Sequence, residues 1–390
     1  MTATRSLASQ AAVVGIGRTA YSRESGRTTL GMAAEACRAA IADAGLQPGD
    51  IDGIADFQAG DSHLGVAVAQ AVGVDQLSFC LDIFGGGNQA CAVVTNAAAA
   101  VQTGQAKTVL VYRSLNGRSG KRFGVATGDN TPMAVPGEGQ FSAPQGYMTP
   151  PQWMAMWARR HQHIHGSSCE DLGQVAITQR RHAHDNPHAI NRDLISMDDY
   201  LATRWVHEPL RLLDCTMEVD GAVAIVITTL DRARDLPHPP VRMHAAAESH
   251  GQGGSWDQWA DPSVMFSHFA APTLWERAGM GPADIDVACI YDCFTYTVMA
   301  VMEDFGFCDK GEVGDFFAGG RATYGGDVVV NPHGGLLSEG YIHGMNHHYE
   351  AVLQLRRAAG SRQVPDATNA LVTAGAGPYG GAIIYTGELG

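Results

Sequence analysis

Ala44-Gly-Leu-Gln-Pro-Gly-Asp-Ile-Asp52 recurs 234 residues later as Ala278-Gly-Met-Gly-Pro-Ala-Asp-Ile-Asp286, with six identical residues at one offset. Each copy closes a helical pattern and leads into a short apolar run, so each marks the end of a helix and the start of a strand. A repeat whose period exceeds half the chain indicates a duplicated domain and not a solenoid of short units. The chain therefore consists of two related halves.

Apolar runs and helical patterns alternate around the first copy. Ala11–Gly17 predicts a buried strand, Thr28–Gly45 a helix that ends at glycine, and Ile51–Phe57 a second strand. Further along, Asn88–Gly104 predicts an alanine-rich helix and Thr108–Tyr112 another buried strand. Strands that alternate with helices are typical of parallel α/β units.

The repeat also guides the domain boundaries that we predict. Gly221-Ala-Val-Ala-Ile-Val226, which closes the first half, resembles Gly380-Gly-Ala-Ile-Ile-Tyr385 near the end of the chain. The proline-rich segment Asp231–Pro240 is a linker between the halves. We predict an N-terminal half over residues 1–235, with a long loop excursion over about 114–215, and a C-terminal half over 236–390.

The composition excludes several classes of protein. The 26 lysines and arginines are outnumbered by 40 aspartates and glutamates, and this net charge of −14 argues against nucleic-acid binding. No apolar run reaches the ~18 residues that span a bilayer. The eight cysteines are scattered without a CxxC pair, as in a reducing cytoplasm. We therefore expect a cytoplasmic protein, and the low charged fraction of 17% indicates a buried subunit interface.

Four segments carry groups suited to chemistry. Phe84-Gly-Gly-Gly-Asn-Gln-Ala-Cys91 is a glycine-rich helix entry whose backbone N–H groups could stabilise an anion, although close packing explains it equally. Tyr291-Asp-Cys-Phe294 follows a strand and faces a crevice, or else Asp292 caps a helix. The other two are Asn331–Gly344, which holds histidines and a tyrosine, and the glycine-rich turn Thr373–Gly381.

A basic cluster stands out in this acidic chain, and it suits a phosphate-bearing ligand such as coenzyme A or, alternatively, salt bridges across a subunit interface. Its members are Arg113, Arg118, Lys121 and Arg122. A metal site is not expected: His343 and His347 are four residues apart, but no HExxH glutamate or third ligand accompanies them.

Together these segments resemble the thiolase superfamily over nearly the whole chain, and its sterol-carrier-protein branch in particular. That branch carries His-Asp-Cys-Phe where this chain has Tyr291–Phe294, and Asn-x-x-Gly-Gly, which Asn331–Gly335 matches. It carries Gly-His-Pro-x-Gly where this chain reads Gly340-Tyr-Ile-His-Gly344. The resemblance implies duplicated α/β domains in a five-layer αβαβα arrangement, and a homodimer.

The departures from the thiolase pattern bear on the chemistry. The cysteine nucleophile of a thiolase would fall at about Gly86–Asn88, where no cysteine stands, and Cys91 lies about one turn further along the helix. The second thiolase cysteine, near Gly375, is also absent. Both histidine positions are tyrosines, Tyr291 and Tyr341. Covalent acyl transfer through a thiolate is therefore not expected.

A narrower resemblance is carried by Tyr112–Gly124 and Leu336–Gly344, which are similar to segments of the lipid-transfer-protein-like (Ltp2-type) aldolases of bacterial steroid side-chain degradation. It implies retro-aldol cleavage of a β-hydroxyacyl-CoA of the 17-hydroxy-20-carboxyl-CoA type to a 17-ketosteroid and propionyl-CoA. Coenzyme A would enter as part of the substrate, with no further cofactor. It also implies a DUF35-type partner with an OB-fold, which helps to bind the acyl-CoA in a hetero-oligomer.

A retro-aldol reaction needs a proton acceptor, a proton donor and an oxyanion site, but no nucleophile. Tyr291 and Tyr341 could fill the two proton roles from opposite sides of the scissile bond, in either order. Because free tyrosine has a pKa of about 10, we expect His343 to assist, with Asp292 and His333 behind it. Two pairs of glycines are expected to hold the thioester oxygen through backbone N–H groups: Gly86 with Gly87, and Gly375 with Gly377.

Two alternatives stay open at this point. One is an authentic thiolase, an acyltransferase that uses a displaced cysteine. The other is a non-catalytic thiolase-like subunit that binds acyl-CoA or scaffolds a partner.

Overall fold

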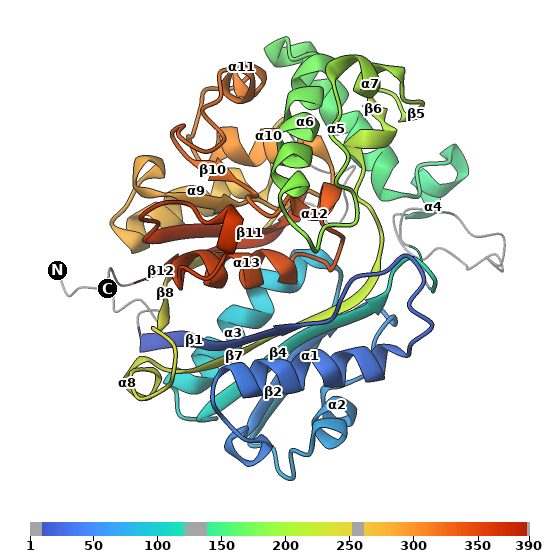
Figure 1. The fold of residues 1–390 in the computed structure, drawn as a ribbon. Coiled ribbons are helices and arrows are strands. Elements are labelled where there is room, and N and C mark those ends of the chain that lie inside the picture. The colour runs from blue at the N-terminus through green and yellow to red at the C-terminus, as the bar shows by residue number, and fades with distance from the viewer. Residues whose placement is uncertain (1–9, 121, 123–138, 252–260, 388–390) are drawn as a thin grey trace.

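The computed structural model describes residues 10–120, 122, 139–251 and 261–387. Within these ranges, ten strands form one sheet in the order β10-β9-β11-β12-β8-β1-β7-β4-β2-β3 (Figure 1). The strands of its first half are β1 (Ala11–Arg18), β2 (Gly53–Gln58), β3 (Phe79–Phe84), β4 (Thr108–Asn116) and β7 (Asp220–Thr229). Those of its second half are β8 (Val241–His250), β9 (Val287–Cys289), β10 (Val329–Val330), β11 (Asn369–Ala376) and β12 (Tyr379–Thr386).

The two halves of the sheet have the same topology. The order β3-β2-β4-β7-β1 in the first half is matched by β10-β9-β11-β12-β8 in the second. In each half the strands at the outer edge pair in parallel, and the others pair antiparallel. The repeated nonapeptide forms a 3₁₀ turn in both copies, Pro48–Asp50 and Pro282–Asp284, which leads into β2 or β9. The predicted duplication is confirmed, whereas the exact domain boundaries remain a prediction.

Helices lie in three layers around the sheet halves. Against the first half pack α1 (Thr29–Asp43) and α2 (Gly65–Val72), and on the outer face of the second lie α9 (Phe266–Ala278) and α10 (Thr295–Asp304). Between the halves, α3 (Ala90–Gln102) and α13 (Met345–Leu355) contact strands of both (Figure 1). The five-layer αβαβα arrangement predicted from the sequence is confirmed.

The residue types explain which helix takes which layer. In β1, Ala11 and Val13 face the large central core, whereas Ala12 and Val14 face α1, because successive side chains of a strand point to opposite faces. α1 buries one face only, as a helix with one sheet neighbour should. α3 is built mainly of alanine and valine, and its small side chains let both halves of the sheet approach it closely.

One short seam joins the halves into a continuous sheet. β1 and β8 pair antiparallel at Ala12 with Arg242 and at Val13 with Val241. The chain crosses from one half to the other through α8 (Leu230–Ala233), which lies within the segment that the prolines marked as a linker.

The excursion between β4 and β7 covers one end of the second half. Its helices are α4 (Gly139–Ser142), α5 (Pro150–His165), α6 (Cys169–His184) and α7 (Met197–Ala202), and its strands β5 (Trp205–His207) and β6 (Leu210–Arg211) pair with each other. α6 packs on α10, α11 (Val313–Ala318) and α12 (Gly335–Ser338). A buried contact of 2.8 Å between His161 Nε2 and Glu303 Oε2 ties α5 to α10.

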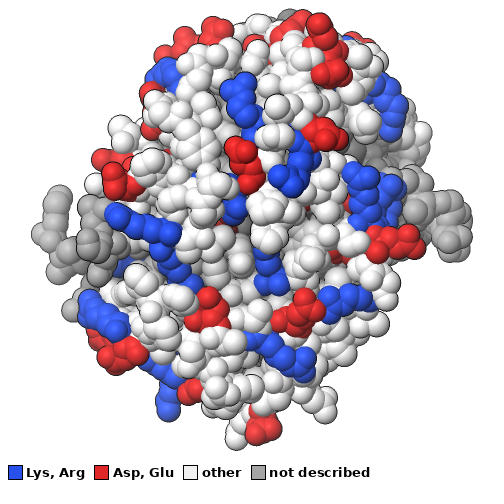
Figure 2. All heavy atoms as spheres, viewed as in Figure 1, with Lys and Arg blue, Asp and Glu red and all other residues white. Residues whose placement is uncertain are grey.

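Acidic and basic side chains are interspersed over the face shown in Figure 2. Among the described residues, no helix combines the length and the apolar character that a bilayer span requires.

Candidate active site

Two phenols from different loops meet at the centre of the candidate site. Tyr291 follows β9 and Tyr341 follows α12, yet their hydroxyl oxygens lie 2.8 Å apart. The rings meet edge to face at a centroid distance of 6.3 Å. Tyr291 is held by a hydrogen bond of 3.0 Å from its backbone N–H to Thr373 Oγ1, and Tyr341 by one of 3.0 Å to the carbonyl of Met217. The predicted pair of tyrosines is therefore brought into direct contact.

The Tyr291 ring occupies the space beside the helix entry where a thiolase would carry its cysteine. A Cβ atom on Gly87 would lie 1.8 Å from the Tyr291 hydroxyl oxygen. A Cβ on Gly344 would lie 3.0 Å from Cδ2 of the same ring. The phenol thus fits only because both backbone neighbours lack a side chain.

Two cysteines, Cys91 and Cys293, lie near this helix entry or the phenols in the sequence, and both are buried. Cys91 is fully buried, its thiol lies 3.7 Å from the carbonyl of Val372, and burial raises its pKa well above the ordinary value. Cys293 lies closer to the phenols in sequence, but its thiol is directed at Thr297 Oγ1, 3.9 Å away. Burial raises the pKa of Cys293 as well. Both side chains are therefore weak nucleophiles at neutral pH.

Burial keeps both phenols protonated. It raises the pKa of Tyr291 well above the ordinary value of tyrosine, and the neighbouring Tyr341 raises it further. The pKa of Tyr341 is also raised by burial, but the hydroxyl of Tyr291 and the charge of Arg113 act in the opposite direction. Cys293 and Glu218 add to the rise, so the phenolate of Tyr341 is disfavoured too, but Tyr341 is the one of the two phenols with neighbours that act to lower its pKa.

Arg113 does not lie with the other basic residues. It is on β4, is fully buried, and forms an ion pair with Asp61 as well as hydrogen bonds to His343 Nδ1. β4 continues to Asn116, beyond the predicted end at Tyr112, because its pairing with β7 extends to Asp220. Arg113 is therefore an inward-facing strand residue at the base of the site, where the expected contact with a coenzyme A phosphate has no access from solvent.

His343 is next to the phenols, as expected, but in a setting unsuited to a base. Its ring lies 4.7 Å from that of Tyr341 between centroids and stacks on Phe57 at 6.4 Å. Burial, together with the cation of Arg113, lowers the pKa of His343 to about 3. The imidazole is therefore neutral at physiological pH.

Asp292 caps a helix. It accepts hydrogen bonds from the backbone N–H of Leu336 at 2.8 Å and of Leu337 at 3.1 Å, both at the start of α12. A Cβ on Gly335 would lie 2.1 Å from Asp292 Oδ2, so the carboxylate sits directly against the backbone of that helix. Asp292 therefore caps a helix, as one interpretation of the sequence predicts. The helix is α12, which begins 43 residues later in the chain, and not α10, which follows Asp292 directly.

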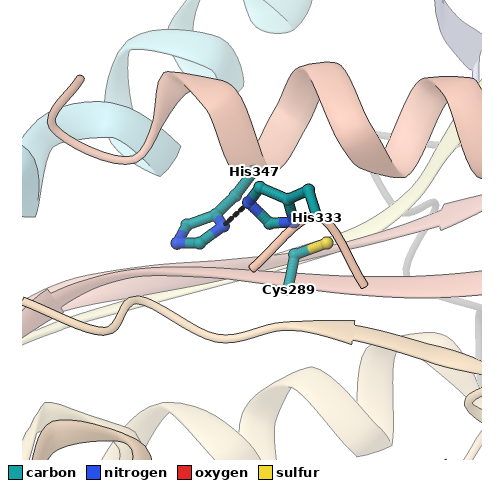
Figure 3. Close-up of side chains that lie close together, drawn as sticks. All are labelled: Cys289, His333 and His347. Carbon is teal, nitrogen blue, oxygen red and sulfur yellow. Dashed lines mark hydrogen bonds between the residues drawn. The ribbon is translucent and has the colours of Figure 1, made fainter. Parts of the chain in front are cut away.

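His333 belongs to a buried chain of polar groups behind Tyr291. Its Nε2 lies 3.1 Å from His347 Nδ1, and His347 Nε2 lies 3.3 Å from Asp292 Oδ1. Cys289 lies beside His333 in Figure 3, and one ligand atom from each of Cys289, His333 and His347 falls within 4.8 Å of the others. The facing nitrogens of the two histidines are bonded to each other, which leaves His333 Nδ1 and His347 Nε2 without a hydrogen bond to any described residue, the latter 3.3 Å from Asp292 Oδ1.

Some of the residues expected to bind the thioester oxygen and coenzyme A lie near the phenols. Gly87 contacts Tyr291, and Arg122 is linked to Tyr341 through Glu218. Gly86 and Gly87 form the turn that enters α3, whereas Gly375 lies in the β11–β12 ladder opposite Gly380 and Gly377 accepts a hydrogen bond from Phe266. Arg122 pairs with Glu218 at 2.5 Å, and Glu218 forms a β-bridge with Tyr341. Arg118 is exposed on the same loop, and Lys121 lies outside the described residues.

Three features of the site carried no signal in the sequence. Asp61 is a loop carboxylate 52 residues before its partner Arg113. His347 was noted only for its spacing from His343, and its contacts are instead with His333 and Asp292. The role of Gly87 as a steric gap for Tyr291 depends on a contact across 204 residues, which no local pattern records.

The fold and this site define a protein of the thiolase type that carries two phenols at its centre. Residues 247–385 match the family described as Thiolase C-terminal domain-like. A 17-hydroxy-3-oxo-4-pregnene-20-carboxyl-CoA lyase of Mycobacterium tuberculosis is 44% identical, over 97% of this chain and 100% of its own length. A steroid side-chain-cleaving aldolase of Thermomonospora curvata is 43% identical, over 96% and 97% of the two chains.

A solved structure agrees with these relatives. The Ltp2-ChsH2(DUF35) aldolase superposes with a TM-score of 0.91 at 40% identity, over 98% of this chain and 100% of that one. The chain belongs to the steroid side-chain aldolase branch of the thiolase superfamily, and it is a carbon–carbon lyase.

Proposed function

We propose that this protein cleaves the side chain of a steroid acyl-CoA by a retro-aldol reaction. The proposed substrate is a 17-hydroxy-20-carboxyl-CoA steroid, and the products are a 17-ketosteroid and propionyl-CoA. Its similarity to a steroid carboxyl-CoA lyase and to a steroid side-chain-cleaving aldolase supports the class of substrate. The observation that carries the mechanism is the 2.8 Å contact between the hydroxyl oxygens of Tyr291 and Tyr341.

The reaction moves one proton and breaks one carbon–carbon bond. The β-hydroxyl loses its proton, its oxygen becomes a ketone, and the electrons of the Cα–Cβ bond pass into the thioester as an enolate. A proton then adds to the α-carbon. Nothing is oxidised or reduced, so the chemistry requires only a route for the proton and a site for the enolate oxygen.

The phenol pair offers that route without a stable phenolate. Tyr341 accepts the proton of the β-hydroxyl while it passes its own proton to Tyr291 along the 2.8 Å hydrogen bond. Tyr291 delivers its proton to the α-carbon. We assign the accepting role to Tyr341 because Tyr291 and Arg113 both act to lower its pKa. Since each phenol gains one proton and loses one, their raised pKa values do not oppose catalysis.

The remaining parts of the proposal concern binding and assembly. Backbone N–H groups at Gly86–Gly87 and Gly375–Gly377 hold the thioester oxygen, and Arg118, Lys121 and Arg122 meet the phosphates of coenzyme A. The protein acts in the cytoplasm as a homodimeric core, and coenzyme A enters only within the substrate. A DUF35-type partner completes a hetero-oligomer, a proposal supported by the name of the related Ltp2-ChsH2(DUF35) aldolase.

The test is a product assay on the chain reconstituted with a DUF35-type partner. Mass spectrometry should detect a 17-ketosteroid and propionyl-CoA from the 17-hydroxy-20-carboxyl-CoA steroid. Tyr291→Phe and Tyr341→Phe should each lower kcat by about 10²–10⁴-fold, the usual effect of removing a proton-transfer group. Tyr324→Phe is the matched control, because that hydroxyl bonds the carbonyl of Arg362. Wild-type rates in both active-site variants would refute the mechanism.

A further inference from the structure

The side chain of Arg113 is held at every nitrogen. Nη1 donates to the carbonyl of Ser114 at 3.0 Å, and Nη2 donates to Asp61. Nε and Nη2 also point at His343 Nδ1, at 3.3 and 3.0 Å. The guanidinium carbon lies 5.3 Å from the centre of the Phe57 ring. Because Arg113 and Asp61 are both buried, with side-chain exposures of 0% and 3%, this geometry is fixed by packing and by the ion pair.

The contact determines where His343 carries its proton. A guanidinium can only donate hydrogen bonds, so the nitrogen that receives two of its N–H groups must offer a lone pair. Nδ1 of His343 is therefore unprotonated, and the single proton of the neutral ring is on Nε2. A second proton on Nδ1 would point directly at the guanidinium cation of Arg113. Asp61 would not offset this repulsion, because its negative charge is already paired with Arg113.

The backbone of His343 is also constrained. It has a φ of 51°, in the left-handed region that residues other than glycine seldom adopt. Such a conformation persists only where the surrounding structure holds it. The imidazole ring is packed by Arg113 on β4 and Phe57 on β2, and Asp61 in the loop that follows β2 acts on it through Arg113.

We propose that Asp61 and Arg113 are positioning residues, which lock His343 as a neutral imidazole with its proton on Nε2 and thereby fix the Tyr341 ring beside it. The sequence indicated His343 as a helper that takes a proton from a phenol. Held in this way, His343 cannot take a proton from a phenol. Its Nδ1 already accepts hydrogen bonds from Arg113, and its Nε2 carries a proton and donates. The tautomer follows from the geometry alone, whereas its kinetic consequence depends on the proposed retro-aldol function.

The tautomer can be measured directly by ¹⁵N NMR on the full chain labelled at histidine. The signals of His343 are identified among the 16 histidines by their loss in His343→Gln. In the wild-type protein, Nδ1 should have the shift of an unprotonated nitrogen and Nε2 that of a protonated one, without titration between pH 5.5 and 8. A proton on Nδ1, or titration in this range, would overturn the proposal.

The matched variant removes both charges of the lock, so that no buried ion is left unpaired. In Asp61→Asn/Arg113→Met, His343 should show both tautomers, and kcat should fall about 10- to 100-fold through misplacement of Tyr341 while KM changes little. His343→Gln, which can place a donor near the position of Nε2, should retain more activity than His343→Leu. A single tautomer and unchanged kcat in the double variant would contradict the lock.

The two proposals can fail separately. A wild-type chain that shows the locked tautomer but no lyase activity with its partner would refute the proposed function only. An active enzyme whose His343 titrates near neutral pH would refute the lock only.

Discussion

Replacing Gly87 by alanine tests the central geometry with a single methyl group. The added Cβ would lie 1.8 Å from the Tyr291 hydroxyl oxygen, 2.4 Å from Cζ and 2.7 Å from Cε2. Non-bonded carbon contacts are normally about 3.5–4.0 Å, so the ring must retreat by roughly 1.5 Å. The backbone of Gly344 also lies close to the ring, because a Cβ there would be 3.0 Å from Cδ2 and 3.1 Å from Cε2.

A displacement of this size breaks the bond between the two phenols. Their oxygens are 2.8 Å apart, and a hydrogen bond between hydroxyls weakens beyond about 3.0 Å. Because a misplacement of ~1 Å can lower a rate about 10²-fold, we expect Gly87→Ala to lower kcat by at least that factor. The double variant Gly87→Ala/Tyr291→Phe should be no slower than Tyr291→Phe alone, since both changes disable one unit.

The assay is the steady-state release of propionyl-CoA by the chain with its DUF35-type partner, with a thermal melt to verify folding. Gly49→Ala is the control: a Cβ there meets no atom within 4 Å, and the equivalent position of the second repeat is already an alanine, Ala283. If Gly87→Ala retained more than half of the wild-type kcat, contact between the phenols would not be required for the reaction.

Three further predictions concern stability, binding and the missing nucleophile. Burial, with Asp82 beside it, raises the pKa of Asp56 to about 9. The folded state therefore keeps a proton that the unfolded chain loses near pH 4, and stability should fall as pH rises from about 4 to 9. Asp56→Asn should flatten this slope in urea unfolding at pH 5 and 8, and an unchanged slope would contradict the assignment. Arg118→Glu should raise KM for the acyl-CoA while kcat stays constant, because it removes binding that does not change in the transition state; a fall in kcat alone would exclude this role. Cys91→Ala should retain most of the activity in the same product assay, and complete inactivation would favour the thiolase alternative.

The division into two related halves is predictable from the sequence, because short local patterns occur twice along the chain. The nonapeptide repeat and the alternation of helices with apolar runs predict the two halves, whereas the five layers follow from the resemblance to thiolases. The resemblance to thiolases places Tyr291 and Tyr341 in one site although 50 residues separate them, but it puts them on opposite sides of the scissile bond and does not predict the contact between their hydroxyls.

The surroundings of the phenols depended on contacts that no local pattern contains. The sequence groups Arg113 with the basic loop because it lies within ten residues of Arg118, Lys121 and Arg122. The pairing of β4 with β7 instead continues past it, and strand alternation turns its side chain into the core alongside Val111 and Leu115. Only there does it meet Asp61 and His343, and only that meeting shows that His343 is a donor.

The inner helices carry a consequence for how such a chain could arise. α3 contacts strands of both halves, and so does α13, so each half supplies a helix that its own strands cover on one side only. A molecule made of a single half would expose the other apolar side of that helix to water. A half on its own would therefore need a second copy stacked against this helix to shield it, and covalent linkage of the two halves supplies that copy within one chain.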